Sequence, residues 1–288
     1  MGVLFSVCSL CGSPESEDGL ATSDGQVRAL IVALEYKYSP SHELSCSKDA
    51  QAMLRMLNRA GVRDITLVTD RHMGTPGFPT RPSVLQAMKE VARRTEPDDW
   101  FFWFFAGHGI NVPDHRGDEA DGFDQAFVTP DHKGRLHEKA LLVDDDFARA
   151  LDTFFVPGVK LLCVCDCCHS GTICDIDSYH YDHEIYSISA AQDDQEAEDT
   201  GRGGLLTYAL RRTIFSLSMS YQENPFSIQT VWERTKKKAD SMTQMQELNF
   251  QFSGTDPHHV AWPMCFDWKK YLHMAKDNMD EYEDYEKA

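Results

Sequence analysis

The sequence predicts an α/β protein built on a mainly parallel β-sheet with helices on both faces. Several short runs are apolar at almost every position, which is typical of strands buried on both faces. The segments between them carry apolar residues at helical spacing. Because the two kinds of segment alternate along the chain, a parallel sheet covered by helices is favoured. The chain has 288 residues, 42% of them hydrophobic, enough for a substantial core.

The individual elements follow from these patterns in chain order. The apolar runs predict strands at 27–36, 64–70, 98–109, 159–166 and 184–190. Helical periodicity predicts helices at 47–61, 81–95, 146–155, 203–218 and 227–242. Gly61 is a stop signal for the first helix, and Pro82 suits the first turn of the second. The sequence NFQFSG at 249–254 is interpreted as a short edge strand.

The two ends of the chain differ from the middle in composition. Residues 1–25 are short of periodic apolar residues and rich in Ser, Gly and acidic residues, so we expect a flexible leader. Residues 269–288 are expected to be an acidic tail. No linker long enough to separate independent domains interrupts 26–268, which predicts one compact domain.

Charge and cysteine content exclude some classes of protein. A net charge of −18 repels nucleic acid and favours cationic partners such as basic peptides or metal ions. The nine cysteines are odd in number and clustered, with no secretory signal, which favours a reducing, cytoplasmic compartment. No apolar run reaches the roughly 18 residues that a membrane-spanning helix needs.

The first residues, MGVLFS, match the pattern for myristoylation at Gly2, and Cys8 and Cys11 could carry palmitoyl groups. Two lipids would anchor the protein stably to the cytoplasmic face of a membrane. The alternatives are a disordered start without modification, and a zinc knuckle from CSLC, which lacks a second cysteine pair.

Residues with catalytic chemistry stand where two predicted strands end. His108 lies in GHG after the third strand, and Cys168 lies in DCCHSG after the fourth. Ligands collect at the carboxyl ends of parallel strands. A thiol with an imidazole beside it is the arrangement of a cysteine nucleophile and its base. The flanking glycines allow backbone N–H groups to approach an oxyanion, which points to Gly109 and Cys168.

The segments FFAGHG and DCCHSGT, together with HELSCSKDAQAM, DEADGFDQAFVTPD, LLVDDDF, YSISAAQDDQEAEDT and GGLLTYAL, occur in the order in which similar segments occur in metacaspases. The chain therefore resembles this calcium-dependent group of caspase-like cysteine peptidases over residues 26–265. The resemblance implies a caspase-like fold with a large-subunit-like part, 26–175, and a small-subunit-like part, 184–268. It also implies a His108–Cys168 dyad and a monomer.

The resemblance implies specificity for Arg or Lys before the cut. It places Cys46, Asp49 and Asp166 in the pocket for the residue preceding the scissile bond. Two carboxylates there would bind a cationic side chain of a protein or peptide substrate and reject an acidic one. Asp49 alone could instead be a helix N-terminal carboxylate stabilised by the helix dipole.

A second acidic group suits calcium, which takes six to eight oxygen ligands. The spacing is not that of an EF-hand, and from the residues alone a solvated acidic surface is the simpler interpretation. By resemblance, the calcium ligands fall on Asp124, Asp144, Asp145 and Asp175.

The leading hypothesis is a calcium-dependent cysteine endopeptidase that cuts after Arg or Lys through an acyl-enzyme. One alternative is a membrane-tethered, non-catalytic scaffold that keeps the caspase fold and the calcium site. Another is a thiol redox or metal protein, which would need a second ligand cluster or a C-x-x-C motif at the sheet edge.

Overall fold

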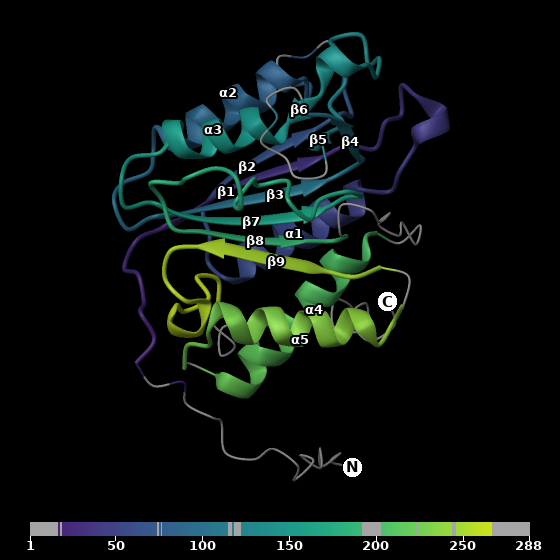
Figure 1. Ribbon diagram of the computed structural model, residues 1–288. Coiled ribbons are helices and arrows are strands. Elements are labelled where there is room, and N and C mark those ends of the chain that lie inside the picture. The colour runs from purple at the N-terminus through teal and green to yellow at the C-terminus, as the bar shows by residue number, and fades with distance from the viewer. Residues whose placement is uncertain are drawn as a thin grey trace, which may run out of the picture.

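The computed structural model describes Glu17 and residues 19–73, 75, 77–114, 117, 122–191, 203–222, 224–243 and 246–266. Its main sheet has six strands in the order β2-β1-β3-β7-β8-β9, and only β9 runs antiparallel to its neighbour (Figure 1). The strands of this sheet are β1 (Val27–Ala33), β2 (Asp64–Thr69), β3 (Trp100–Ala106), β7 (Lys160–Asp166), β8 (Ile185–Ser189) and β9 (Asn249–Ser253).

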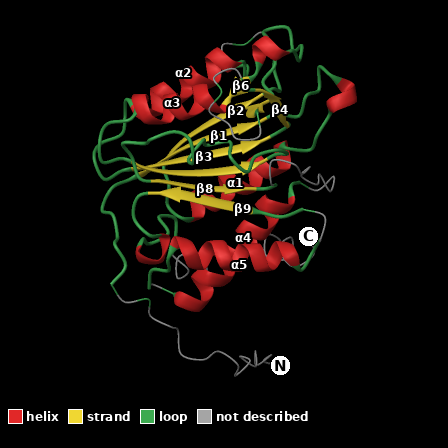
Figure 2. Cartoon of the chain, viewed as in Figure 1, coloured by secondary structure: helices red, strands yellow, loops and turns green. Residues whose placement is uncertain are grey.

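Helices cover both faces of this sheet, as Figure 2 shows. One face packs on α1 (Ser47–Arg59), α4 (Leu205–Tyr221) and α5 (Ile228–Asp240), and the other on α2 (Arg81–Ala92) and α3 (Asp144–Phe154). Two apolar cores result, one on each side of the sheet. The predicted α/β class, with a mainly parallel sheet and helices on both faces, is confirmed.

The residues explain where the helices start. The Thr80 side chain accepts the N–H of Ser83 at 3.3 Å, and Pro82 occupies the first turn of α2. Ser227 caps α5 in the same way, accepting the N–H of Thr230 at 3.1 Å. The helix α3 begins with three aspartates, which the positive end of a helix dipole stabilises.

A second, three-stranded antiparallel sheet was not anticipated. It consists of β4 (Gly109–Pro113), β5 (Phe123–Phe127) and β6 (Leu142–Val143) in the order β4-β5-β6. Its strands have two to five residues, too short for a reliable apolar pattern. Because only two residues separate the end of β3 from the start of β4, this sheet stands directly beside the carboxyl edge of the main sheet.

Part of the predicted leader is packed on the domain. The Glu17 carboxylate accepts the N–H of Ser227 at 2.8 Å and the hydroxyl of Thr230 at 2.6 Å. Ala21 forms a parallel bridge with Val260. The packed structure therefore already includes Glu17 and residues 19–25, ahead of the predicted boundary at residue 26.

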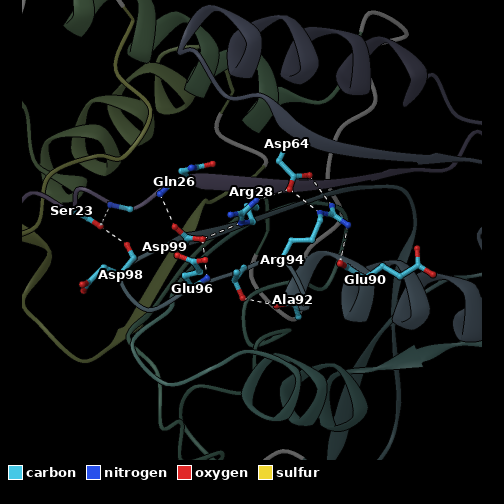
Figure 3. Close-up of polar contacts among 12 residues, drawn as sticks. Ser23, Gln26, Arg28, Asp64, Glu90, Ala92, Arg94, Glu96, Asp98 and Asp99 are labelled. Carbon is cyan, nitrogen blue, oxygen red and sulfur yellow. Dashed lines mark hydrogen bonds and ion pairs between the residues drawn. The ribbon is translucent and has the colours of Figure 1, made fainter.

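The amino edge of the main sheet is held by a charged network (Figure 3). Arg28 on β1 reaches Asp64 at 2.9 Å and Asp99 at 3.0 Å. Arg94 makes a second contact with Asp64 at 2.7 Å. This edge lies opposite the carboxyl ends of the strands, so we assign it a structural role.

Candidate active site

The sheet order places a topological switch point between β1 and β3. From β1 the chain crosses to β2 on one side and then returns to β3 on the other, so the segments following β1 and β3 diverge. Such a switch point is the usual ligand site of an open parallel sheet. The segments that leave β1, β3 and β7 at this edge contain the predicted pocket residue Cys46, His108 and Cys168.

Strand register sets His108 beside Cys168. Ala106 and Asp166 are partners at the ends of β3 and β7, and each predicted catalytic residue lies two positions further on. Gly109 shows that the two segments are in close contact, because a Cβ atom added there would collide with the carbonyl oxygen of Cys168. Glycine is therefore required at position 109 for the two segments to approach.

The His108 ring is held by groups from the segment after β1. Its Nε2 is 2.8 Å from the carbonyl oxygen of His42, at the end of the short helix Pro40–His42. A carbonyl only accepts hydrogen bonds, so Nε2 carries the hydrogen and, in the neutral ring, Nδ1 is the basic nitrogen. The ring centroid also lies 4.7 Å from that of Tyr36.

Tyr36 holds the backbone of the segment that contains His108. Its hydroxyl accepts the N–H of His108 at 2.8 Å and donates to the carbonyl of Val128 at 2.9 Å. The residue is buried and has a φ of 56°, an unfavourable conformation for a tyrosine. Neither the Tyr36 hydroxyl nor the His42 carbonyl was identified from the sequence. Only the position of Tyr36 just after a strand could have drawn attention to it.

The cysteines around Cys168 have different environments. Cys168 is half-buried, and His169 after it has a φ of 46°, which turns the chain sharply. Cys163, Cys165 and Cys167 are buried in the core on the α2 and α3 face. Burial raises the pKa of all three thiols well above the ordinary value. They are packing residues, as free cysteines in cores usually are.

The structure brings two of the predicted pocket residues, Asp49 and Asp166, to the N-terminus of α4. Asp49 Oδ1 accepts the N–H of Gly204 at 2.9 Å. Asp166 Oδ2 accepts the N–H of Thr207 at 2.8 Å and its hydroxyl at 2.6 Å. Both carboxylates are buried, and the positive end of the α4 dipole favours their charge.

The third predicted pocket residue, Cys46, is buried and lies just before α1, three positions before Asp49. The two glycines before α4 are needed for the approach of the carboxylates. A Cβ atom at Gly203 would strike Asp49, and one at Gly204 would strike Asp166. Gly203 also has a φ of 114°, which other residues rarely adopt.

The predicted calcium ligands come from three elements. Asp124 on β5, Asp144 at the start of α3 and Asp175 after β7 are each at least 95% buried. Burial raises the pKa of Asp144 to about 8, and the charges of Asp124 and Asp175 contribute to the rise. These three carboxyl groups are therefore near enough to interact. Asp145 is less buried, and its N–H donates to Asp144 at 2.7 Å.

The acidic cluster is connected to the segment carrying Cys168. Asp144 Oδ2 accepts the N–H of Gln125 at 2.5 Å, and the Gln125 side chain accepts the hydroxyl of Thr172. The Thr172 carbonyl in turn accepts the N–H of Asp175 at 2.5 Å. Within the described residues, however, no group of three or more Asp, Glu, His or Cys side chains is arranged to hold a metal ion.

The predicted lipidation residues Gly2, Cys8 and Cys11 lie outside the described residues. Among the residues that are described, no helix has the length and apolar character to cross a bilayer.

Comparison with known proteins agrees with this arrangement. A family model described as "Metacaspase, peptidase C14 domain" matches residues 27–177. Metacaspase-2 of Arabidopsis thaliana is 30% identical over 222 residues, which is 66% of this chain and 52% of that protein. Metacaspase-1B of Aspergillus fumigatus is 34% identical over 155 residues, 53% of this chain and 37% of that protein. The chain thus spans about half, or less, of the length of these relatives.

A solved structure of a protein from Geobacter sulfurreducens is similar with a TM-score of 0.62 at 23% identity. The similarity covers 84% of this chain and 99% of that chain, and it shows the fold alone. The family model, by contrast, covers more than half of the chain and includes both His108 and Cys168. This chain therefore belongs to the metacaspase family of C14 peptidases.

Proposed function

We propose that this protein is a calcium-dependent cysteine endopeptidase that cleaves after Arg or Lys. The observation that carries the proposal is the register of β3 and β7: His108 and Cys168 each follow the paired residues Ala106 and Asp166 by two positions at the carboxyl edge of the sheet. Family membership supports a cysteine peptidase, and the carboxylates near the dyad support the cation and the specificity.

In the proposed reaction, the Cys168 sulfur attacks the carbonyl carbon of the scissile bond, and its proton passes to Nδ1 of His108. The carbonyl becomes an oxyanion that accepts hydrogen bonds from the N–H groups of Gly109 and Cys168. When the C–N bond breaks, His108 returns the proton to the leaving amine, and a thioester remains on Cys168. Water, deprotonated by His108, then hydrolyses the thioester and regenerates the thiol.

The pocket for the residue before the cut is proposed to consist of Cys46, Asp49 and Asp166. Each carboxylate has hydrogen bonds from α4 on one oxygen, and a carboxylate can accept several more. Two negative charges in a buried site favour a guanidinium or ammonium group over a carboxylate. Since Arg offers two parallel donors, we expect Arg to bind at least as well as Lys.

Calcium is proposed to bind Asp124, Asp144, Asp145 and Asp175. The donor set fits a hard cation, because these side chains offer only oxygen ligands, three of them are buried, and their ionised forms bring several negative charges close together. A bound cation would neutralise these charges. The Asp144–Gln125–Thr172 contacts would then hold the segment that follows Cys168 in one conformation.

Other expectations remain part of the proposal. Substrates would be proteins or peptides with Arg or Lys before the cut, and nucleic acid would not be bound. We propose a cytoplasmic monomer, divided into parts 26–175 and 184–268, with acylation at Gly2, Cys8 and Cys11 as the route to a membrane. The six-stranded sheet supports a single folding unit, since β7 of the first part pairs with β8 of the second.

The test is hydrolysis of fluorogenic peptides ending in Arg, Lys or Asp, with calcium and with chelator, by the full chain and by Cys168→Ala. We expect calcium-dependent cleavage after Arg and Lys that the substitution abolishes. Cleavage after Asp would overturn the pocket assignment. Equal cleavage in chelator would overturn the calcium requirement. Absence of cleavage in every condition would favour the non-catalytic scaffold.

A further inference from the structure

A second pocket adjoins His108 on the side away from Asp49 and Asp166. Its volume is about 350 Å³, at the small end of ligand pockets. His108 lines it together with His42, His137 and Glu138, and the rest of the lining is apolar: Ile110, Val112, Val128, Leu136 and Leu141. These come from β4, the segment after β5 and the residues around the short helix Glu138–Ala140.

This pocket lies on the opposite side of the main sheet from the proposed Arg pocket with Asp49 and Asp166. Val112, Val128 and Leu141 belong to the core on the α2 and α3 face. Cys46 belongs to the core on the α1 and α4 face. Neither Cys168 nor the carboxylates Asp49 and Asp166 line the pocket. A substrate lying across the carboxyl edge could therefore reach both sites, with the dyad between them.

The chemistry of the dyad decides which substrate residue faces the pocket. His108 must come within hydrogen-bond reach of the leaving nitrogen in order to protonate it. The part of the substrate after the scissile bond therefore lies on the His108 side of the nucleophile. The pocket is bounded by His108 and not by Cys168, so it adjoins the leaving-group side.

We propose that this pocket binds the apolar side chain of the residue that follows the scissile bond. The inference rests on the proposed peptidase function and adds a second specificity to it. Apolar walls favour Leu, Ile, Met or Phe at this position, because burial removes their surface from water. Glu138 also lines the pocket, and its negative charge, in a chain with a net charge of −18, disfavours an acidic residue there.

The proposal is tested with internally quenched peptides that share an Arg before the cut and carry Leu, Gly or Asp after it. A matching peptidyl-Arg methyl ester, whose leaving group is only methanol, reports the dyad and the Arg pocket alone. For the full chain with calcium we expect kcat/KM to be about tenfold higher for Leu than for Gly, as apolar pockets usually discriminate. Asp should be the poorest of the three.

Ile110→Ser is the main variant, because Ile110 is 37% exposed and its substitution should not prevent folding. Normalised to ester hydrolysis by the same variant, its preference for Leu over Gly should fall close to one. Leu67→Ser is the matched control: Leu67 is 47% exposed, on β2 and outside the pocket. It should keep the wild-type preference.

The outcomes separate the two proposals. The pocket assignment alone would be overturned if the wild-type protein hydrolysed the ester but did not prefer the Leu peptide over the Gly peptide. It would also be overturned if Ile110→Ser kept the wild-type preference for Leu. An ester that is not hydrolysed, or that Cys168→Ala hydrolyses equally well, would overturn the peptidase function and this inference with it.

Discussion

Single hydrogen bonds hold His108, the proposed catalytic histidine, in place. Tyr36 contacts both the backbone and the ring of His108, and its hydroxyl links the segment after β3 to Val128 beside the apolar pocket. It touches no reacting atom in the proposed mechanism, so it is a positioning residue.

Replacing Tyr36 with Phe tests this role. The variant keeps the ring but removes the hydroxyl that accepts the backbone N–H of His108. We expect kcat to fall about tenfold, which is equivalent to about 1.4 kcal/mol, and KM to change little. Steady-state kinetics on the Arg peptide measure both constants. Tyr38→Phe is the control, since its exposed hydroxyl contacts only the segment around Arg71 and Met73. A variant that loses affinity but keeps kcat would argue against positioning.

Asp166 offers a substitution that separates charge from structure. In Asp166→Asn, the amide oxygen can still accept both hydrogen bonds from Thr207, but the negative charge is lost. Removing one partner of a buried charge pair costs about 2 kcal/mol or more of binding energy. We therefore expect kcat/KM for the Arg peptide to fall about 30-fold, the equivalent of about 2 kcal/mol. The melting temperature should change little.

Asp166→Ala removes the acceptor too and should lower the free energy of unfolding by about 1 kcal/mol, as loss of a helix cap does. Urea unfolding of the two variants distinguishes these contributions. An unchanged preference for Arg in Asp166→Asn would show that this carboxylate does not contact the substrate.

At the scale of elements, the start of α3 joins the acidic cluster to the catalytic edge. Asp144 lies where β6 ends and α3 begins, and its contacts run through β5 to the segment after β7. A change of charge at Asp144 is therefore transmitted through hydrogen bonds to β5 and to the segment after β7.

The raised pKa of Asp144, about 8, predicts how stability depends on pH in chelator. The folded protein holds a proton that the unfolded chain loses near its ordinary pKa of 3.8. This contribution is fully present below that value and is lost as the pH rises through about 8. We expect the Asp144→Asn variant to lose less stability between pH 5 and 8, as measured by urea unfolding in buffers of about those values.

Asp146→Asn, on the same helical turn but paired with Arg81 and Arg149, is the control and should follow the wild-type profile. Replacing chelator with calcium should raise the melting temperature of the wild type but not of Asp144→Asn. The calcium assignment would fail if both proteins responded alike.

At the scale of the molecule, the two edges of the main sheet have separate roles. The carboxyl edge holds the candidate site, and the amino edge holds the Arg28–Asp64–Asp99 network (Figure 3). Hydrogen bonds from Arg94 and Arg28 lower the pKa of Asp64 below its ordinary value. Its stabilising contribution is therefore present above the pKa of the unfolded chain and is lost as the pH falls through the folded value.

Arg28→Met should lower the free energy of unfolding by about 1–3 kcal/mol, because it leaves two partly buried carboxylates short of a partner. The loss should shrink in acid, and activity per folded molecule should not change. Urea unfolding measures the stability loss, and active-site titration gives the fraction of folded molecules by which the activity is divided. Lys236→Met, in a more exposed ion pair, should cost less than about 1 kcal/mol. An activity loss in Arg28→Met beyond the folded fraction would contradict the separation.

Much of this architecture follows from local patterns. Each strand of the main sheet and each of the five described helices was anticipated, because buried parallel strands are continuously apolar and helices repeat every 3.6 residues. The small sheet was missed because its strands are short, and one ends in Pro113. The packing of Glu17 was also missed, since a single carboxylate has no periodicity.

The sequence by itself determined the order of elements and pointed to the candidate reactive groups. His108 stands between two glycines and Cys168 three residues before one, each just after a predicted strand, so local pattern was sufficient to propose them. Only the tertiary structure decided which distant groups meet: Asp49 and Asp166 at α4, the His42 carbonyl at His108, and the apolar pocket beyond it. The reason is physical. Neighbours in this sheet are not neighbours in the chain, and a backbone carbonyl or a cavity has no residue type by which a sequence could reveal it.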